Sequence, residues 1–300
     1  MEFIPTNCAI CRTSGNSQKV YSANLDEKTF SVEVFSARRL PDRRHYQWVQ
    51  CNTCELLRSD PILNVDLADL YEKSSFDYSS EVEGLKRAYV SVTKKAIAPR
   101  KPNGSVLEVG GGNGFFLEAA LDAGFTSAHA VEPSIEAVAA SRSDIKENTI
   151  IDMMRPGLIP DNSHDVVAMF HVMDHLPDPL DTVKTCVAAL KPGGTFVVAV
   201  HNFNSWSSRL LKEKSPIVDV EHTFLYSKKT ASRLFAAAGL VNVKTGSYRN
   251  LYSLAYLVHL IPLPNRLKLG ILNSVLAKPL QKIRVSVPLG NMWVSGEKPL

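Results

Sequence analysis

From residue 105 onward, short apolar runs alternate with stretches of helical periodicity. The apolar runs predict strands at Ser105–Val109, Ser127–Val131, Thr149–Ile151, Asp165–Phe170, Thr195–Val200 and Leu240–Thr245, with a last strand near Met292–Ser295. Helices are predicted between them at Asn113–Ala123, Ser134–Ser141, Asp178–Leu190 and Lys228–Ala238. Because strands separated by helices pair in parallel, this order predicts a doubly wound α/β sheet.

The rest of the chain divides at changes of composition. Residues 1–60 hold four of the five cysteines, and residues 61–103 are aromatic-rich and end in the turn-like Pro99–Gly104. We therefore expect an N-terminal cysteine module over 1–60, a helical linker or lid over 61–103, and the α/β domain over 104–300. Within that domain, residues 249–288 are expected to form a helical insertion or cap.

A glycine-rich loop follows the first predicted strand of the α/β domain. It contains Gly110, Gly111, Gly112 and Gly114. Glycines let the chain turn sharply and let a ligand lie against bare backbone. The dinucleotide pattern G-x-G-x-x-G does not fit, because Phe115 stands where a glycine is needed.

Two acidic residues end neighbouring strands beside this loop. A carboxylate such as Glu108 at the strand tip repels a pyrophosphate and attracts an ammonium group. Roughly twenty residues further on, Glu132 can accept both hydroxyls of a ribose. The pattern therefore indicates an adenosine with a cationic tail, a description that S-adenosylmethionine fits. The alternative is that both are surface acids beside ordinary turns.

Four stretches together resemble the class I S-adenosylmethionine-dependent methyltransferases, over about residues 104–245. They are Val106–Gly114, Val131–Pro133, Asp165–Pro179 and Ala189–Gly194. The resemblance implies a Rossmann-like seven-stranded sheet with the cofactor across the carboxyl ends of its first and fourth strands. An acid commonly sits where this chain has Asp174.

The same resemblance implies roles for residues along the cofactor. Glu132, next to Pro133, would hold the ribose, and the loop glycines would line the methionine side. Phe170 and His171 would lie near the sulfonium. Asp152 would meet the adenine amine, with Met153 packing on the ring.

The cysteines form two pairs, Cys8-x-x-Cys11 and Cys51-x-x-Cys54. Two such turns complete a tetrahedral zinc site of four thiolates, with strands at Lys19–Ser22 and Thr29–Phe35 filling the gap as a ribbon. A closed four-thiolate site makes the zinc structural. The alternatives are two unrelated pairs of free thiols, or His45 as a substitute ligand.

The run Gln50–Pro61 followed by Leu70-Tyr71 resembles the zinc-ribbon entry of one methyltransferase subgroup. That subgroup is often found acting on sugars, cell-surface glycans and secondary metabolites. The resemblance implies that the acceptor is a small molecule or a glycan and that the acceptor atom is oxygen. The acceptor could be linked to a nucleotide or to a lipid.

Methyl transfer needs an aligned acceptor, and a base can remove the acceptor's proton. Histidine suits that task because it titrates near neutrality. His222, in a Glu-His pair that resembles those of small-molecule members, is the first candidate, and His201 is the second. The alternative is a histidine that only hydrogen-bonds a loop.

The formal net charge is +4, and no block of five Lys or Arg occurs, so a nucleic-acid partner is not expected. Two other functions stay open. One is an RNA methyltransferase that uses the zinc ribbon to hold nucleic acid, and the other is a non-catalytic protein that binds the cofactor.

The segment 249–288 is apolar and basic. One interpretation is that this segment contacts a membrane or a lipid-linked substrate. The other is that it covers the acceptor pocket or forms a dimer interface. Both a monomer and a homodimer therefore remain open. The apolar stretch Leu251–Leu263 is broken by Pro262 and is shorter than the ~20 residues that span a bilayer. With no signal peptide at the N-terminus, we expect a cytoplasmic protein, with the inner face of the membrane as an alternative site.

Overall fold

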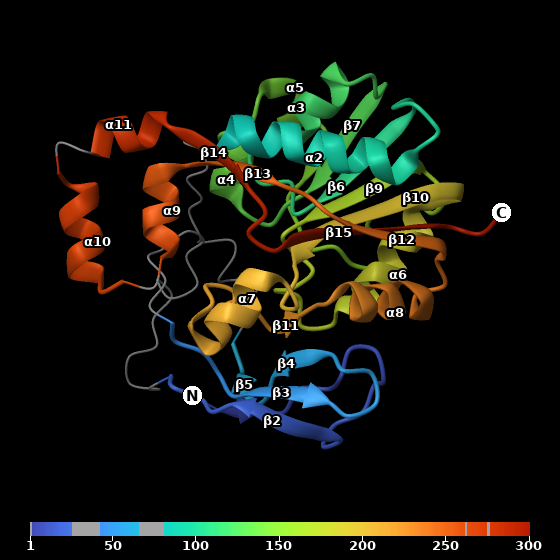
Figure 1. Ribbon diagram of the computed structural model, residues 1–300. Coiled ribbons are helices and arrows are strands. Elements are labelled where there is room, and N and C mark those ends of the chain that lie inside the picture. The colour runs from blue at the N-terminus through green and yellow to red at the C-terminus, as the bar shows by residue number, and fades with distance from the viewer. Residues whose placement is uncertain (1, 26–42, 66–80, 262, 275–276) are drawn as a thin grey trace.

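The computed structural model describes residues 2–25, 43–65, 81–261, 263–274 and 277–300. Figure 1 shows a large twisted sheet covered by helices, a small sheet from the N-terminal residues beside it, and a group of helices at one end. The predicted strand Thr29–Phe35 and the pair Leu70-Tyr71 lie outside the described residues.

The large sheet has seven strands in the order β12-β15-β10-β9-β6-β7-β8. They span β6 (Ser105–Val109), β7 (Ser127–Val131), β8 (Thr149–Ile150), β9 (His164–Phe170), β10 (Leu190–His201), β12 (Val241–Ser247) and β15 (Asn291–Glu297). Strands β10, β9, β6, β7 and β8 are parallel to one another. β15 lies between β10 and β12 and runs antiparallel to both. The predicted Rossmann-like sheet of seven strands is confirmed.

Both faces of this sheet are buried, which explains the continuous apolar runs in the sequence. α2 (Val82–Ile97) and α3 (Phe115–Asp122) share a core cluster with Val106, Val166 and Val197. α6 (Pro179–Ala189) and α8 (Lys228–Ala237) share the opposite cluster, with Leu107 and Val198. Successive strand residues therefore point into different layers.

The predicted helix Ser134–Ser141 forms as α4 (Ile135–Ala139). A second short helix, α5 (Ser143–Glu147), which was not predicted, follows it. The Ser134 side chain accepts a hydrogen bond from the Ala137 amide and so caps α4 at its start.

The small sheet has the order β11-β4-β3-β2. Its strands are β2 (Ser17–Tyr21), β3 (Trp48–Cys51), β4 (Leu57–Ser59) and β11 (Phe224–Leu225). A separate short pair joins β1 (Phe3–Ile4) to β5 (Ile62–Leu63). Because β11 comes from the α/β part of the chain, the N-terminal module shares a sheet with that part.

Between β10 and β11 lie α7 (Trp206–Leu211) and the 3-10 turn η3 (Lys212–Lys214). After β12, β13 (Asn250–Ser253) pairs antiparallel with β14 (Arg284–Val287). The chain between them forms α9 (Leu254–Leu260), α10 (Asn265–Leu272) and α11 (Ala277–Lys282), the group at the end of the sheet in Figure 1. Among the described residues, no helix combines the length and the apolar character that crossing a membrane requires.

Candidate functional site

A cavity of about 850 Å³ opens at the carboxyl ends of β6, β7, β9 and β10. A doubly wound sheet binds ligands at this edge because its loops diverge there. The structure brings the predicted cofactor residues together on one side of the cavity. Its lining includes Glu108, Gly110, Gly111, Gly112, Glu132, Pro133, Asp152, Met153, Phe170 and His171.

The glycine loop presents bare backbone to the cavity at Gly112. This residue has φ +52°, and a Cβ built on it would meet no atom within 4 Å. Its amide donates a 2.8 Å hydrogen bond to Glu132 Oε2, and the Ser134 amide donates one of 2.8 Å to Oε1. The Glu132 carboxylate is therefore held at the cavity wall in one orientation.

Gly114 was expected among the residues that line the methionine side, and that role stays a prediction. Gly114 is absent from the cavity lining and caps the start of α3 with φ +74°. A Cβ there would meet Ile145 Cγ2 at 2.5 Å, so the glycine is needed for close packing.

Glu108 and Glu132 are buried, with 3% and 6% of their surface exposed, so they are not surface acids. Glu108 Oε2 has no hydrogen-bond partner within the described part of the chain. Burial, and after it the charge of Glu132, raises the pKa of Glu108 well above its ordinary value. Two buried carboxylates at one wall favour a cationic ligand group.

Asp152 and Met153 lie on the cavity wall after β8. Asp152 Oδ1 accepts a 2.7 Å hydrogen bond from the Met153 amide, and Oδ2 accepts one of 2.9 Å from Arg155. The Arg155 hydrogen bond lowers the pKa of Asp152. The carboxylate therefore stays ionised and can accept a further hydrogen bond from a ligand.

Tyr89, in α2, is a wall residue to which the sequence alone assigned no role. It stacks on Phe170 with ring centroids 4.2 Å apart and an interplanar angle of 14°. His171 follows with φ +55°, and its Nε2 lies 2.9 Å from Tyr248 Oη. The aromatic character of residues 61–103 was the one signal that could have pointed to Tyr89.

A cluster of four histidines also lines the cavity. His171, His175, His201 and His222 all line the cavity, and the carboxylate of Asp174 lies behind them with 1% of its surface exposed. The ring centroids of His201 and His222 are 5.7 Å apart. Burial lowers the pKa of His201, which keeps its ring neutral. The two predicted base candidates are thus brought together.

The remaining wall of the cavity is apolar and comes from segments to which the sequence assigned no individual residues. It includes Trp206, Leu210, Tyr252, Tyr256, Leu257, Leu260 and Ile261 from α7, β13 and α9. Its polar atoms include the Tyr252 hydroxyl, which accepts 3.0 Å hydrogen bonds from the side-chain amides of Asn250 and Asn291. This wall suits an apolar molecule with few polar groups.

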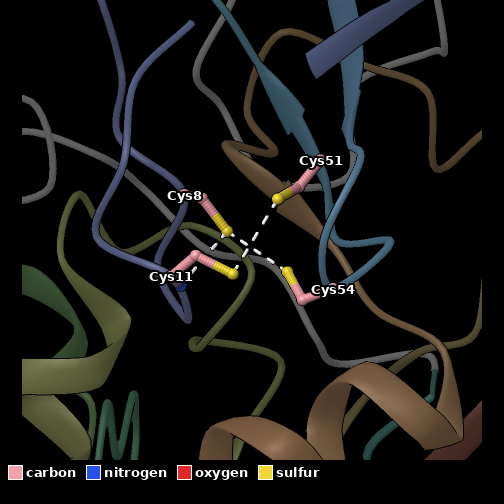
Figure 2. A group of neighbouring side chains, drawn as sticks. All are labelled: Cys8, Cys11, Cys51 and Cys54. Carbon is pink, nitrogen blue, oxygen red and sulfur yellow. Dashed lines mark hydrogen bonds between the residues drawn. The ribbon is translucent and has the colours of Figure 1, made fainter. Parts of the chain in front are cut away.

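The four cysteines of the N-terminal module converge from two turns, as Figure 2 shows. Cys8 Sγ lies 3.3 Å from Cys54 Sγ, and Cys51 Sγ lies 3.9 Å from Cys11 Sγ. The Cys54 thiol lowers the pKa of Cys8 to about 5 by hydrogen bonding. These four ligand atoms form one group, and His45 is not part of it.

Residues 82–245, more than half of the chain, match the model of a family described as "Methyltransferase domain". The ubiquinone biosynthesis O-methyltransferase of Xanthomonas campestris pv. campestris is 31% identical over 107 residues, covering 34% of this chain and 44% of that protein. The enzyme of the same name from Psychrobacter cryohalolentis is 28% identical over 146 residues, covering 46% and 56%. The chain thus spans about half the length of the curated relatives that it matches.

Solved structures share the fold. An S-adenosylmethionine-dependent methyltransferase from Archaeoglobus fulgidus superposes with a TM-score of 0.50 at 18% identity, covering 77% of this chain and 98% of that one. The YcgJ protein of Bacillus subtilis gives a TM-score of 0.50 at 18% identity, covering 71% and 99%. With the family match and the sheet order in agreement, the chain belongs to the methyltransferase domain family and has the class I methyltransferase fold.

Proposed function

We propose that the chain transfers the methyl group of S-adenosylmethionine to an oxygen atom of a small, largely apolar acceptor. One observation carries the proposal: a single cavity joins the Gly112–Glu132 wall to a wall of histidines and apolar side chains. The names of the curated relatives, ubiquinone biosynthesis O-methyltransferases, support oxygen as the acceptor atom.

In this proposal the cofactor lies along the carboxyl ends of β6, β7 and β9. Glu132 accepts the ribose hydroxyls, and Glu108 attracts the ammonium of the methionine part. Asp152 accepts a hydrogen bond from the adenine amine while Met153 packs on the ring. Phe170 and His171 then border the sulfonium, at the boundary between the two halves of the cavity.

The acceptor's hydroxyl proton passes to a histidine of the cluster, with His222 and His201 as the two candidates. The acceptor oxygen forms the new O–C bond, the S–C bond of the sulfonium breaks, and the demethylated cofactor leaves. A neutral ring is required to take the proton, and burial keeps the pKa of His201 low enough for that.

The acceptor class follows from the wall opposite the cofactor. Its leucines, tyrosines and tryptophan suit an apolar molecule better than a sugar, whose many hydroxyls need many polar partners. Trp206, Leu210 and Ile261 border the cavity and are also 61%, 72% and 45% exposed. A lipid-linked acceptor reaching the cavity over this rim is therefore part of the proposal.

The N-terminal module is proposed to hold one structural zinc ion. A tetrahedral site with Zn–S bonds of ~2.3 Å places sulfurs ~3.8 Å apart, and the distances of 3.3 and 3.9 Å lie on either side of that value. Cys8, Cys11, Cys51 and Cys54 fill all four positions, so no position is left for a substrate.

The test incubates the purified chain with S-adenosylmethionine and two acceptor panels, phenols with apolar substituents and simple sugars. We expect the demethylated cofactor and a methyl ether from the phenol panel. Cofactor binding without any turnover would favour a non-catalytic protein. A gel shift with RNA that weakens with salt, together with methylated RNA, would favour the nucleic-acid alternative.

A further inference from the structure

The Asp174 carboxylate is buried, and no hydrogen bond from the described residues stabilises its charge. Only 1% of the residue is exposed, and neither carboxylate oxygen has a hydrogen-bond partner among the residues that the structure describes. An uncompensated buried carboxylate costs several kcal/mol. A cation beside it would remove that cost.

Two imidazole nitrogens face this carboxylate at a distance too long for a hydrogen bond. His175 Nε2 lies 3.8 Å from Oδ1, and His222 Nε2 lies 3.7 Å from Oδ2. The three ligand atoms lie within 4.8 Å of one another. Three ligand atoms this close together can contact one bound ion.

The hydrogen bond on the other side of the His175 ring fixes which nitrogen carries its proton. Nδ1 lies 3.0 Å from the Glu221 carbonyl oxygen, which can only accept, so the proton is on Nδ1. In the neutral ring, the lone pair of Nε2 then faces the carboxylate oxygen. Two electron-rich atoms that face each other across this gap are stabilised by a positive charge, which either a proton on Nε2 or a metal ion between them supplies.

We propose that Asp174, His175 and His222 bind a divalent transition-metal ion, as a site distinct from the four-cysteine site. Two histidines and one carboxylate form catalytic zinc sites and non-haem iron sites, and they leave coordination positions open. The Glu221 carbonyl orients His175 as carbonyl groups commonly orient metal-binding histidines. The Asp174 backbone carbonyl accepts hydrogen bonds from the Thr223 and Phe224 amides, which ties the two ligand loops together.

A second group, His171, Asp174 and His201, shares the same carboxylate. There the His171 Nε2 lies 2.9 Å from Tyr248 Oη, a hydroxyl that can either donate or accept. The lone-pair conflict seen at His175 therefore does not arise at His171, and the geometry favours the group with His175.

The ion has a consequence for the acceptor, and this step rests on the proposed function. His175 and His222 line the cavity, so an open position of the ion faces the acceptor. A hydroxyl bound there has a lowered pKa. The hydroxyl proton goes to His201, and the hydroxyl oxygen takes the methyl group as the S–C bond of the sulfonium breaks. The ion therefore favours an acceptor that can bind it through one hydroxyl or through two adjacent oxygens.

The test measures the metal content of the full-length chain with the cysteine site already loaded with zinc. After Co²⁺ or Zn²⁺ is added and the protein is desalted, we expect one further equivalent per chain by mass spectrometry of the metals. Asp174→Asn, His175→Gln and His222→Gln should each lose that equivalent. His164→Gln should keep it, because neither His164 nor its neighbour His129 belongs to any of the candidate metal-binding groups found among the described residues.

The His175→Gln variant keeps the test decisive if the buried Asp174 variant fails to fold, since the His175 side chain is 18% exposed. The proposal is overturned if no ion beyond the cysteine site binds, or if the variants retain it. Loss in His201→Gln with retention in His175→Gln would assign the ion to the other group. Metal binding without methyl transfer would overturn the proposed function and leave the metal site standing.

Discussion

Ser59 Oγ donates a 3.1 Å hydrogen bond to the backbone carbonyl of His222. The Ser59 amide also donates a 2.9 Å hydrogen bond to the carbonyl of Thr223, just before β11 joins β4. A cavity histidine is thus carried on a loop that the N-terminal sheet holds in place. The cysteine module positions the site although the four sulfurs do not line the cavity.

The first prediction concerns this connection. Cys51→Ser should release the zinc, lower the melting temperature and reduce kcat by about 10- to 100-fold, because small displacements of a reacting group cost that much. The affinity for S-adenosylmethionine should change little, since Gly112 and Glu132 belong to the large sheet. Metal analysis, thermal unfolding and calorimetry measure the three effects.

The matched control is Cys186→Ala, a buried cysteine of α6 outside the four-cysteine group. It should keep its zinc and its kcat. Equal losses of cofactor affinity and kcat in Cys51→Ser would mean that the module supports the whole domain rather than the His222 loop.

The second prediction concerns the ribose. Glu132→Gln should weaken S-adenosylmethionine binding by about 10- to 100-fold, because hydrogen bonds to a charged group contribute about 1.5–3 kcal/mol. Calorimetric titration measures the change. Glu136→Gln alters an exposed acid in the following helix and should leave the affinity unchanged. Equal affinities for Glu132→Gln and the wild type would remove Glu132 from the cofactor site.

The third prediction separates backbone strain from ligand contact at Gly112. Gly112→Ala puts a methyl group into space that the cofactor is proposed to occupy, so binding should fall sharply while the fold persists. Gly157 has φ +80° and equally open surroundings, but it lies outside the cavity lining. Gly157→Ala should cost a similar ~1–2 kcal/mol of stability for its left-handed conformation and spare cofactor binding. Loss of binding in both variants would contradict this assignment.

The fourth prediction concerns the base. His222→Ala should abolish turnover and leave cofactor affinity nearly unchanged, because the ring lines the cavity and is proposed to face the acceptor rather than the cofactor. Calorimetry and a single-turnover assay separate the two effects, and His201→Ala should be compared in the same way. An active His222→Ala variant would exclude His222 as the base.

The fifth prediction concerns stability at low pH. Burial, followed by the charges of His129 and Lys191, lowers the pKa of His164 from 6.5 to about 4. Between these values the unfolded chain binds a proton that the folded chain does not, so stability should fall as pH drops from about 6.5 to about 4. The contribution is on the order of 3 kcal/mol. Denaturant titrations of the wild type and His164→Gln should show a flatter pH profile in the variant, and parallel profiles would refute the assignment.

The α/β sheet could be predicted because its evidence is local. Parallel strands buried on both faces require continuous apolar runs, and the glycine loop and the strand-end acids stand at fixed offsets from them. The sequence therefore indicated Glu108, Gly112 and Glu132, which all line the cavity. It could not indicate that Gly114 packs closely against Ile145, because a packing glycine and a ligand-contacting glycine have the same sequence signal.

The sequence by itself determined the order of strands and helices, the two cysteine pairs and the carboxylates at the strand ends, because each depends on residues close together along the chain. Only the tertiary structure decided that Ser59 supports the His222 loop, that Tyr89 stacks on Phe170, and that four histidines surround Asp174. These contacts join residues far apart in the chain. Their distances are set by how the elements pack, and no local pattern encodes that packing.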